Sequence, residues 1–160
     1  MRALHGIALL GLLAGALSGC EGVTTGTEVV RMPLQVAEPG AAGSYAPVKF
    51  TLGPEMNPVA INFRAEFSQN AAEFGRWNTY RAALTREGTV EASRHVNINH
   101  PQSRADGAAP PPTGTVHTLF IIDVQTSGEY QLTLTPVQPV AIVLSNAQVD
   151  VRRNVQRPPQ

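Results

Sequence analysis

Apolar and polar residues alternate along most of the chain after residue 27. The longest regular alternation runs from Val59 to Phe67. Its odd-numbered positions hold Val59, Ile61, Phe63, Ala65 and Phe67, and its even-numbered positions hold Ala60, Asn62, Arg64 and Glu66. Because successive side chains of a strand point to opposite faces, a period of two predicts a strand with one face in the core and one in solvent.

The same alternation predicts further short strands, which are separated by Gly, Pro and Asn. Their ranges are 28–36, 48–52, 78–86, 89–99, 116–124, 130–134, 140–144 and 149–151. Pro33 cannot donate to a sheet ladder, so the first of these strands is expected at a sheet edge. Together they predict an all-β fold, an antiparallel β-sandwich of the Greek-key or jelly-roll type with about nine short strands.

Three segments break the alternation. Residues 70–75 have Asn70 and Glu73 at the spacing of a capping box and end in Gly75, which predicts at most one short helix there. Residues 101–114 lack large apolar groups and are expected to form one long loop. Residues 154–160 are expected to be a disordered tail, which leaves 28–153 as the single β-sandwich domain.

The pattern also predicts which side chains are buried. Phe63, Ile122 and Leu132 lie at inward parity, and each is expected in the core. Arg64 and Thr133 lie at the opposite parity, where replacement by Ala should change stability by no more than about 0.5 kcal/mol.

The start of the strand at 130 carries a local motif. Gly128 stands two residues before Tyr130, which resembles the tyrosine corner of Greek-key sandwiches. Thr126 and Leu132 stand where the immunoglobulin pattern has Asp and Cys. The resemblance implies a Greek-key topology, with the tyrosine hydroxyl bonded to nearby backbone.

The first nineteen residues have the layout of a secretory signal peptide. Arg2 gives a positive start, residues 7–17 are apolar apart from glycines, and Ser18 and Gly19 are small. The alternative is an uncleaved membrane anchor. Residues 3–19 are at the lower limit of length for a spanning helix, about 17 residues, and contain several glycines, which favours the signal peptide.

The tetrapeptide Leu17-Ser18-Gly19-Cys20 resembles the lipobox of bacterial lipoproteins. The resemblance implies cleavage before Cys20 and acylation of this residue, with residues 20–27 as a lipidated tether. It places the protein in the bacterial cell envelope, held to a membrane by lipid. Enterobacterial lipoproteins with Asp after the cysteine stay in the inner membrane, so Glu21 favours the outer membrane, facing the periplasm.

The composition bears on the possible binding partners and on the kinds of metal site or disulfide that the domain could have. Cys20 is the only cysteine, so the domain has no disulfide and no metal site built on cysteine pairs. Twelve basic residues balance twelve acidic ones, which gives no reason to expect nucleic acid as a partner. We expect no cofactor.

The candidate ligand-binding residues are Arg76, Trp77 and Tyr80. Exposed aromatic rings beside a cation could stack on a sugar or anchor a partner protein. The alternative is that Trp77 closes the core, and this is our expectation, because a lone Trp in a small domain is usually buried.

The mature histidines are His95, His100 and His117. A small copper or zinc site would need His95 and His117 on paired strands. The favoured interpretation is that these histidines are exposed polar residues on solvent-facing sides of the strands. We therefore expect no metal. No catalytic motif is present, so we expect that the protein is not an enzyme.

The sequence therefore predicts a membrane-anchored envelope lipoprotein with a non-catalytic β-sandwich domain. Its favoured role is a protein–protein interaction or accessory assembly subunit, with the edge strand 28–36 accepting a partner by β-augmentation. The alternative is a carbohydrate or small-ligand binding module around Trp77 and Tyr80. An enzyme of unrecognised type is the third hypothesis.

Overall fold

The computed structural model describes residues 22–38, 43–102 and 113–157. These residues form eight strands and two short 3-10 turns, η1 (Pro54–Met56) and η2 (Ala71–Glu73). The strands are β1 (Thr27–Pro33), β2 (Val48–Leu52), β3 (Val59–Phe67), β4 (Trp77–Arg86), β5 (Thr89–Asn99), β6 (Gly114–Ile122), β7 (Gly128–Pro136) and β8 (Leu144–Arg153).

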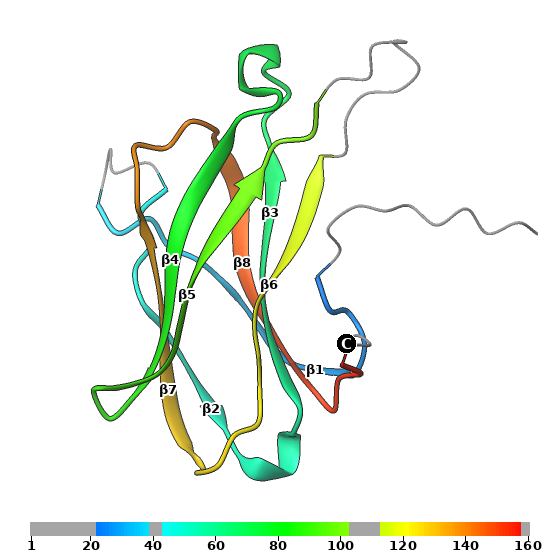
Figure 1. Ribbon diagram of the computed structural model, residues 1–160, viewed down its shortest axis with the longest axis vertical. Coiled ribbons are helices and arrows are strands. Elements are labelled where there is room, and N and C mark those ends of the chain that lie inside the picture. Colours follow the sequence, from blue (N-terminus) through cyan, green and yellow to red (C-terminus); the bar gives the residue numbers. More distant parts are fainter. Residues whose placement is uncertain (1–21, 39–42, 103–112, 158–160) are drawn as a thin grey trace, which may run out of the picture.

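The strands form two antiparallel sheets that pack face to face (Figure 1). The first sheet has the order β1-β8-β3-β6, and the second has the order β2-β7-β4-β5. The antiparallel pairs β1·β8, β2·β7, β3·β6 and β4·β5 are those of one long hairpin rolled up into two sheets. This is the jelly-roll topology, so the predicted β-sandwich is confirmed.

The inner faces of both sheets build one hydrophobic core. At its centre, the rings of Tyr45, Phe63 and Tyr80 lie 6.1–6.2 Å apart. Phe63 and Leu132 are buried as predicted, whereas Ile122 is half-buried. Period-two burial holds along β4, where inward residues are buried and outward ones are not, because the strand has one face on the core and one in solvent.

The predicted strands 140–144 and 149–151 are not two strands. The first range lies mostly in the loop between β7 and β8, and the second is part of β8, which starts at Leu144. Asn146, expected in a gap, has a positive φ of 49° inside β8, where the pairing with β3 shifts register. A bulge therefore replaces the expected turn, and the strand number is eight instead of nine.

A second bulge reverses the parity of β6. Ile61 pairs with Phe120 and Asn62 pairs with Thr118, so Leu119 is the extra residue and is buried. As a result, Thr118 faces outward with Asn62. The polar side of β6 cannot be read from simple alternation beyond this point.

Two local predictions agree with the structure. Residues 71–73 form a single 3-10 turn, and the Asn70 side chain caps it by accepting from the Ala72 N–H at 3.1 Å. The Tyr130 hydroxyl donates to the Thr126 carbonyl at 2.8 Å, which is the contact of a tyrosine corner.

The expected disordered tail starts in ordered structure. The Asn154 N–H donates to the Met56 carbonyl at 2.9 Å, and the Val155 N–H donates to the Pro58 carbonyl at 3.1 Å. Val155 is buried. The chain therefore stays on the sandwich beyond β8, because these backbone bonds and the burial of Val155 hold it next to η1. Residues 158–160 lie outside the described residues, as do the signal peptide, Cys20, Glu21 and most of the loop predicted at 101–114.

Candidate functional site

Trp77 and Tyr80 lie on opposite faces of the second sheet. Trp77 is the first residue of β4 and is 55% exposed on the outer face. Tyr80 is 1% exposed and belongs to the core. The expectation that Trp77 closes the core is therefore wrong, and a platform made of both rings does not form, because three residues along a strand reverse the direction of the side chain.

Tyr80 is part of the hydrophobic core and not of a binding surface. Its hydroxyl accepts from the Asn78 amide at 3.3 Å, and burial raises the pKa of Tyr80 above its ordinary value. Burial likewise raises the pKa of neighbouring Tyr45. Both rings therefore stay neutral and serve packing.

The outer face around Trp77 carries neutral polar and cationic side chains. Asn99 pairs directly with Trp77, and Thr79 pairs with Asn97, whose Oδ1 accepts from the Thr79 hydroxyl at 2.8 Å. The next pair along this face is Arg81 and His95, and Thr135 of β7 lies on the other side of Arg81. All these side chains except half-buried Thr79 are exposed. Arg76, which precedes Trp77, is exposed as well.

Acidic residues of the described outer face lie away from Trp77. Glu91 is near the β4–β5 turn, at the far end of β5 from Asn99, and Glu129 is at the far end of β7 and pairs with Lys49 across 2.8 Å. The half of the sheet that contains Trp77 therefore offers an indole, amides, hydroxyls and guanidinium groups.

Buried hydrogen bonds hold this end of the sheet. Asn78, which points inward beside Trp77, accepts from the backbone N–H groups of Ala141 and Ile142 and donates to the Ile142 carbonyl at 2.9 Å. The buried Glu73 carboxylate accepts from the Val143 N–H at 2.8 Å. These bonds fix the β7–β8 loop and the segment before Trp77, so the exposed indole stands on a firmly held strand.

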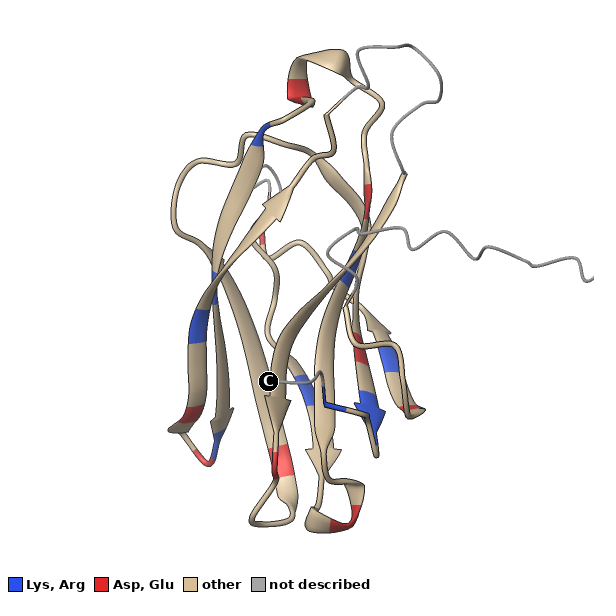
Figure 2. Ribbon diagram, turned by 45° about the vertical axis from the view of Figure 1, so that its right-hand side comes forward, with Lys and Arg blue, Asp and Glu red and all other residues tan. Residues whose placement is uncertain are grey.

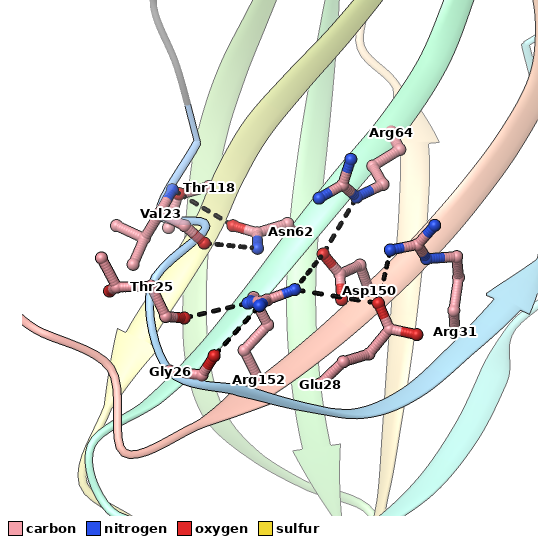
Figure 3. Close-up of polar contacts among 10 residues, drawn as sticks. All are labelled: Val23, Thr25, Gly26, Glu28, Arg31, Asn62, Arg64, Thr118, Asp150 and Arg152. Atoms are coloured by element: carbon pink, nitrogen blue, oxygen red, sulfur yellow. Dashed lines mark hydrogen bonds and ion pairs between the residues drawn. The ribbon is translucent and has the colours of Figure 1, made fainter.

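A polar network occupies the outer face of the first sheet (Figure 3). Its centre is Asp150, which is 0% exposed and accepts from Arg64 Nε at 2.9 Å. Arg152 lies 3.7 Å from both Asp150 and Glu28, and Glu28 also pairs with Arg31. Asp150 Oδ1 has no hydrogen-bond partner. A buried carboxylate surrounded by arginines is typical of a cluster that stabilises the fold, because an unpaired buried charge is costly.

Residues 22–26, which we call the strap, cross the outside of this sheet. The Gly22 N–H donates to the Val116 carbonyl at 2.8 Å, and the Val23 N–H donates to Thr118 Oγ1 at 2.7 Å. Asn62, buried beneath the strap, donates to the Val23 carbonyl at 2.9 Å. These residues belong to the expected tether, and their contacts make this part of the segment a component of the folded domain.

A small cleft of about 220 Å³ lies at the opposite end from Trp77. Arg86, Glu91, Asp123 and Tyr130 are among its lining residues. Arg86 is paired with Glu91 at 3.2 Å, and Asp123 is paired with Arg157. These charged groups of the cleft are therefore already paired with groups of opposite charge. The volume of the cleft is also below the range of about 300–1,000 Å³ that is usual for ligand pockets.

The histidines do not meet. His95 is exposed on the outer face of the second sheet, His100 is buried between Phe67 and Phe74, and His117 is the cross-strand partner of the inward Phe63. His117 was expected on the polar side, but the β6 bulge turns it inward, and burial lowers its pKa. Within the described ranges, no three His, Cys, Asp or Glu side chains are grouped so that they could hold a metal ion.

Figure 2 shows basic and acidic residues interspersed over the described strands. No protein-family model and no curated protein matches the chain. Among the described residues, the helical segments are too short to cross a bilayer.

Proposed function

We propose that this domain is a carbohydrate-binding module of a lipid-anchored envelope lipoprotein, and that it acts by binding and not by catalysis. The ligand would lie on the outer face of the second sheet, next to Trp77. The observation that carries this proposal is the 55% exposure of Trp77, the only tryptophan of the chain, on a held strand. The sequence alone favours an assembly subunit, because a lone Trp in a small domain is usually buried and Trp77 is therefore expected in the core.

The chemistry of the face fits a sugar. An aromatic side chain offers about 150–250 Å² of contact area, and its flat apolar face matches the C–H face of a pyranose ring. Asn97, Asn99 and Thr135 offer neutral donors and acceptors for hydroxyl groups, and Arg81 offers donors. A binding site on strands keeps its geometry better than one on loops.

The lipid anchor is part of the same proposal. The lipobox-like tetrapeptide at 17–20 supports acylation of Cys20 and a place in the cell envelope, with the outer membrane favoured by Glu21. Two or three acyl chains give stable membrane attachment, whereas a single chain does not. The module would therefore be retained near glycans of the envelope.

The direct test uses the fluorescence of Trp77. A Cys20→Ser protein is titrated with peptidoglycan fragments, lipopolysaccharide-derived oligosaccharides and neutral β-linked oligosaccharides. We expect a saturable change in emission with one of these classes. Trp77→Ala lacks the fluorophore, so its affinity is measured by isothermal titration calorimetry beside the wild type, and binding should weaken at least about tenfold, which corresponds to about 1.4 kcal/mol.

Two variants make the test specific. Asn99→Ala removes an amide beside Trp77 and should also weaken binding. Val90→Ala changes a residue that is 56% exposed on the same strand as Asn99 but at the β4–β5 turn, and it should bind like wild type. Lack of saturable binding by every class, or equal binding by Trp77→Ala, would exclude the glycan-binding role.

An assembly role remains the second candidate, because β1 is an edge strand. It pairs only with β8 in its sheet, and Val29 on it is 38% exposed. A free edge can accept a partner strand by β-augmentation. Val29→Lys should then abolish copurification of a specific envelope protein while leaving glycan binding unchanged. Unaltered copurification would exclude this edge as the interface.

A further inference from the structure

The strap determines where the chain leaves the domain toward Cys20. Starting from β1 and going back along the chain, the strap crosses β8 and β3 on the outside of the first sheet and ends beside β6 (Figures 1 and 3). Arg152 of β8 donates to the carbonyls of Thr25 and Gly26 at 2.9 and 3.0 Å. The Gln156 N–H donates to Thr25 Oγ1 at 3.0 Å, so the C-terminal segment holds the strap as well.

Close packing holds the other end of the strap. Gly22 is buried, and a Cβ atom added there would lie 2.6 Å from the Val116 side chain. Its neighbour Val23 is bonded through both its N–H and its carbonyl, to Thr118 and Asn62. The segment is therefore attached at β6, β3 and β8 in succession. Movement of Gly22 away from the sheet would break these bonds and expose the buried Asn62 amide.

Very little chain separates this fixed point from the proposed lipid. Only Glu21 lies between Cys20 and Gly22. Two residues of fully extended chain span no more than about 7 Å. A flexible tether of eight residues, as the range 20–27 would suggest, would have allowed the domain to tumble. A link this short holds the β6 side of the first sheet close to the lipid headgroups.

We propose that the strap-bearing outer face of the first sheet lies against the bilayer, and that the outer face of the second sheet, with Trp77, points away from it. The partner of the strap-bearing face is thus a lipid surface. The two sheets of a sandwich lie about 10 Å apart, so Trp77 would be on the far side of both layers. This orientation rests on the acylation of Cys20 but is independent of which ligand Trp77 binds.

The test measures which face is near lipid in the acylated full-length protein, reconstituted in phosphatidylethanolamine and phosphatidylglycerol vesicles. Vesicles with a nitroxide on the headgroup quench nearby tryptophans. Trp77 is the reporter for the second sheet in the wild-type protein. For the first sheet, the reporter is Gln148→Trp in a Trp77→Phe background. Gln148 pairs with Arg64 on the outer face and has no bond to the strap in the structure.

We expect the nitroxide to remove most of the emission at position 148 and little of the emission of Trp77. The control variant has twelve Gly and Ser residues inserted between Glu21 and Gly22. It keeps the strap contacts but gives a flexible link with a mean span of about 20 Å. Quenching at position 148 should fall in this variant, because the domain is free to reorient.

Equal quenching at both positions, or stronger quenching of Trp77, would overturn the orientation while leaving the anchor intact. Unchanged quenching at position 148 in the variant with the inserted link would overturn the role of the short link. Mass spectrometry of the purified protein reports acylation of Cys20 separately. An unacylated Cys20 would overturn the anchor and the orientation together, but the glycan titration of the unacylated protein would still decide the ligand-binding proposal.

Discussion

Arg64 covers the fully buried carboxylate of Asp150, with 2.9 Å between Nε and Oδ2. Both side chains lie on the outer face of the first sheet, on neighbouring strands β3 and β8. From outward parity alone, Arg64→Ala is expected to change stability by no more than about 0.5 kcal/mol, and the structure revises this expectation. The strap and the neighbouring arginines turn this part of the face into interior, so the pair is structural.

The first prediction is that Arg64→Ala destabilises the domain by about 3 kcal/mol, because it removes one partner of a buried ion pair. Thr133→Ala, on the outer face of the second sheet, is the matched control and should change the free energy of unfolding by no more than about 0.5 kcal/mol. Urea denaturation of the domain from Glu21 onward measures both. Similar small changes for the two variants would show that Asp150 does not depend on Arg64.

The second prediction concerns the loop beside Trp77. Asn78→Ala leaves the N–H groups of Ala141 and Ile142 without their acceptor, and each unsatisfied buried group costs about 1–3 kcal/mol. We expect lower stability and faster amide exchange at 141–143. Asn97→Ala removes an exposed amide and should leave exchange in this loop unchanged. Slow exchange in both variants would mean that Asn78 does not hold the loop.

The third prediction separates the two aromatic residues of β4. Trp77→Ala should cost little stability because the indole is more than half exposed, whereas Tyr80→Ala should cost about 3–5 kcal/mol by leaving a cavity in the core. The folded protein should also show red-shifted emission that iodide or acrylamide quenches readily. Blue emission protected from quenchers would place Trp77 in the core and contradict the structure.

The fourth prediction is a pH dependence. Burial lowers the pKa of His117 below its ordinary value of 6.5, so the unfolded chain takes up this proton at a higher pH than the folded one. Stability should therefore decrease as the pH falls below about 6.5, and the decrease should end at the folded pKa.

The variant that tests this dependence is His117→Gln, which should flatten the stability curve between pH 7.5 and pH 5. His95→Gln, on an exposed outer position, is the matched control and is expected to keep the wild-type curve. Urea denaturation at several pH values measures all three proteins. An unchanged slope in His117→Gln would assign the pH dependence to other groups.

The fifth prediction concerns the anchor. Cells that produce the protein and receive a clickable fatty acid should label the wild type and not Cys20→Ser, which should stay unprocessed or leave the membrane. Labelling that persists in Cys20→Ser would show that the lipid is attached to another residue. An unlabelled wild type would exclude the lipoprotein assignment.

Local patterns in the chain account for most of the fold. The alternation at 59–67 and 78–86 depends only on the two-residue period of a strand facing a core, and both strands are found in place. The tyrosine corner and the capped turn at 70–73 are also local, since their partners lie within four residues. The two bulges, at Leu119 and Asn146, escape the pattern because register depends on the neighbouring strand.

The sequence by itself determined the fold class and the edge position of the first strand, because both follow from neighbouring residues. Only the tertiary structure decided that Trp77 is exposed, that Arg64 is tied to Asp150, and that residues 22–26 are fixed to the sheet. Each of these depends on partners far away in the chain: Asn99 of β5 pairs with Trp77, β8 supplies Asp150, and β3 and β6 hold the strap. Parity tells which way a side chain points, whereas burial depends on what else packs against that face.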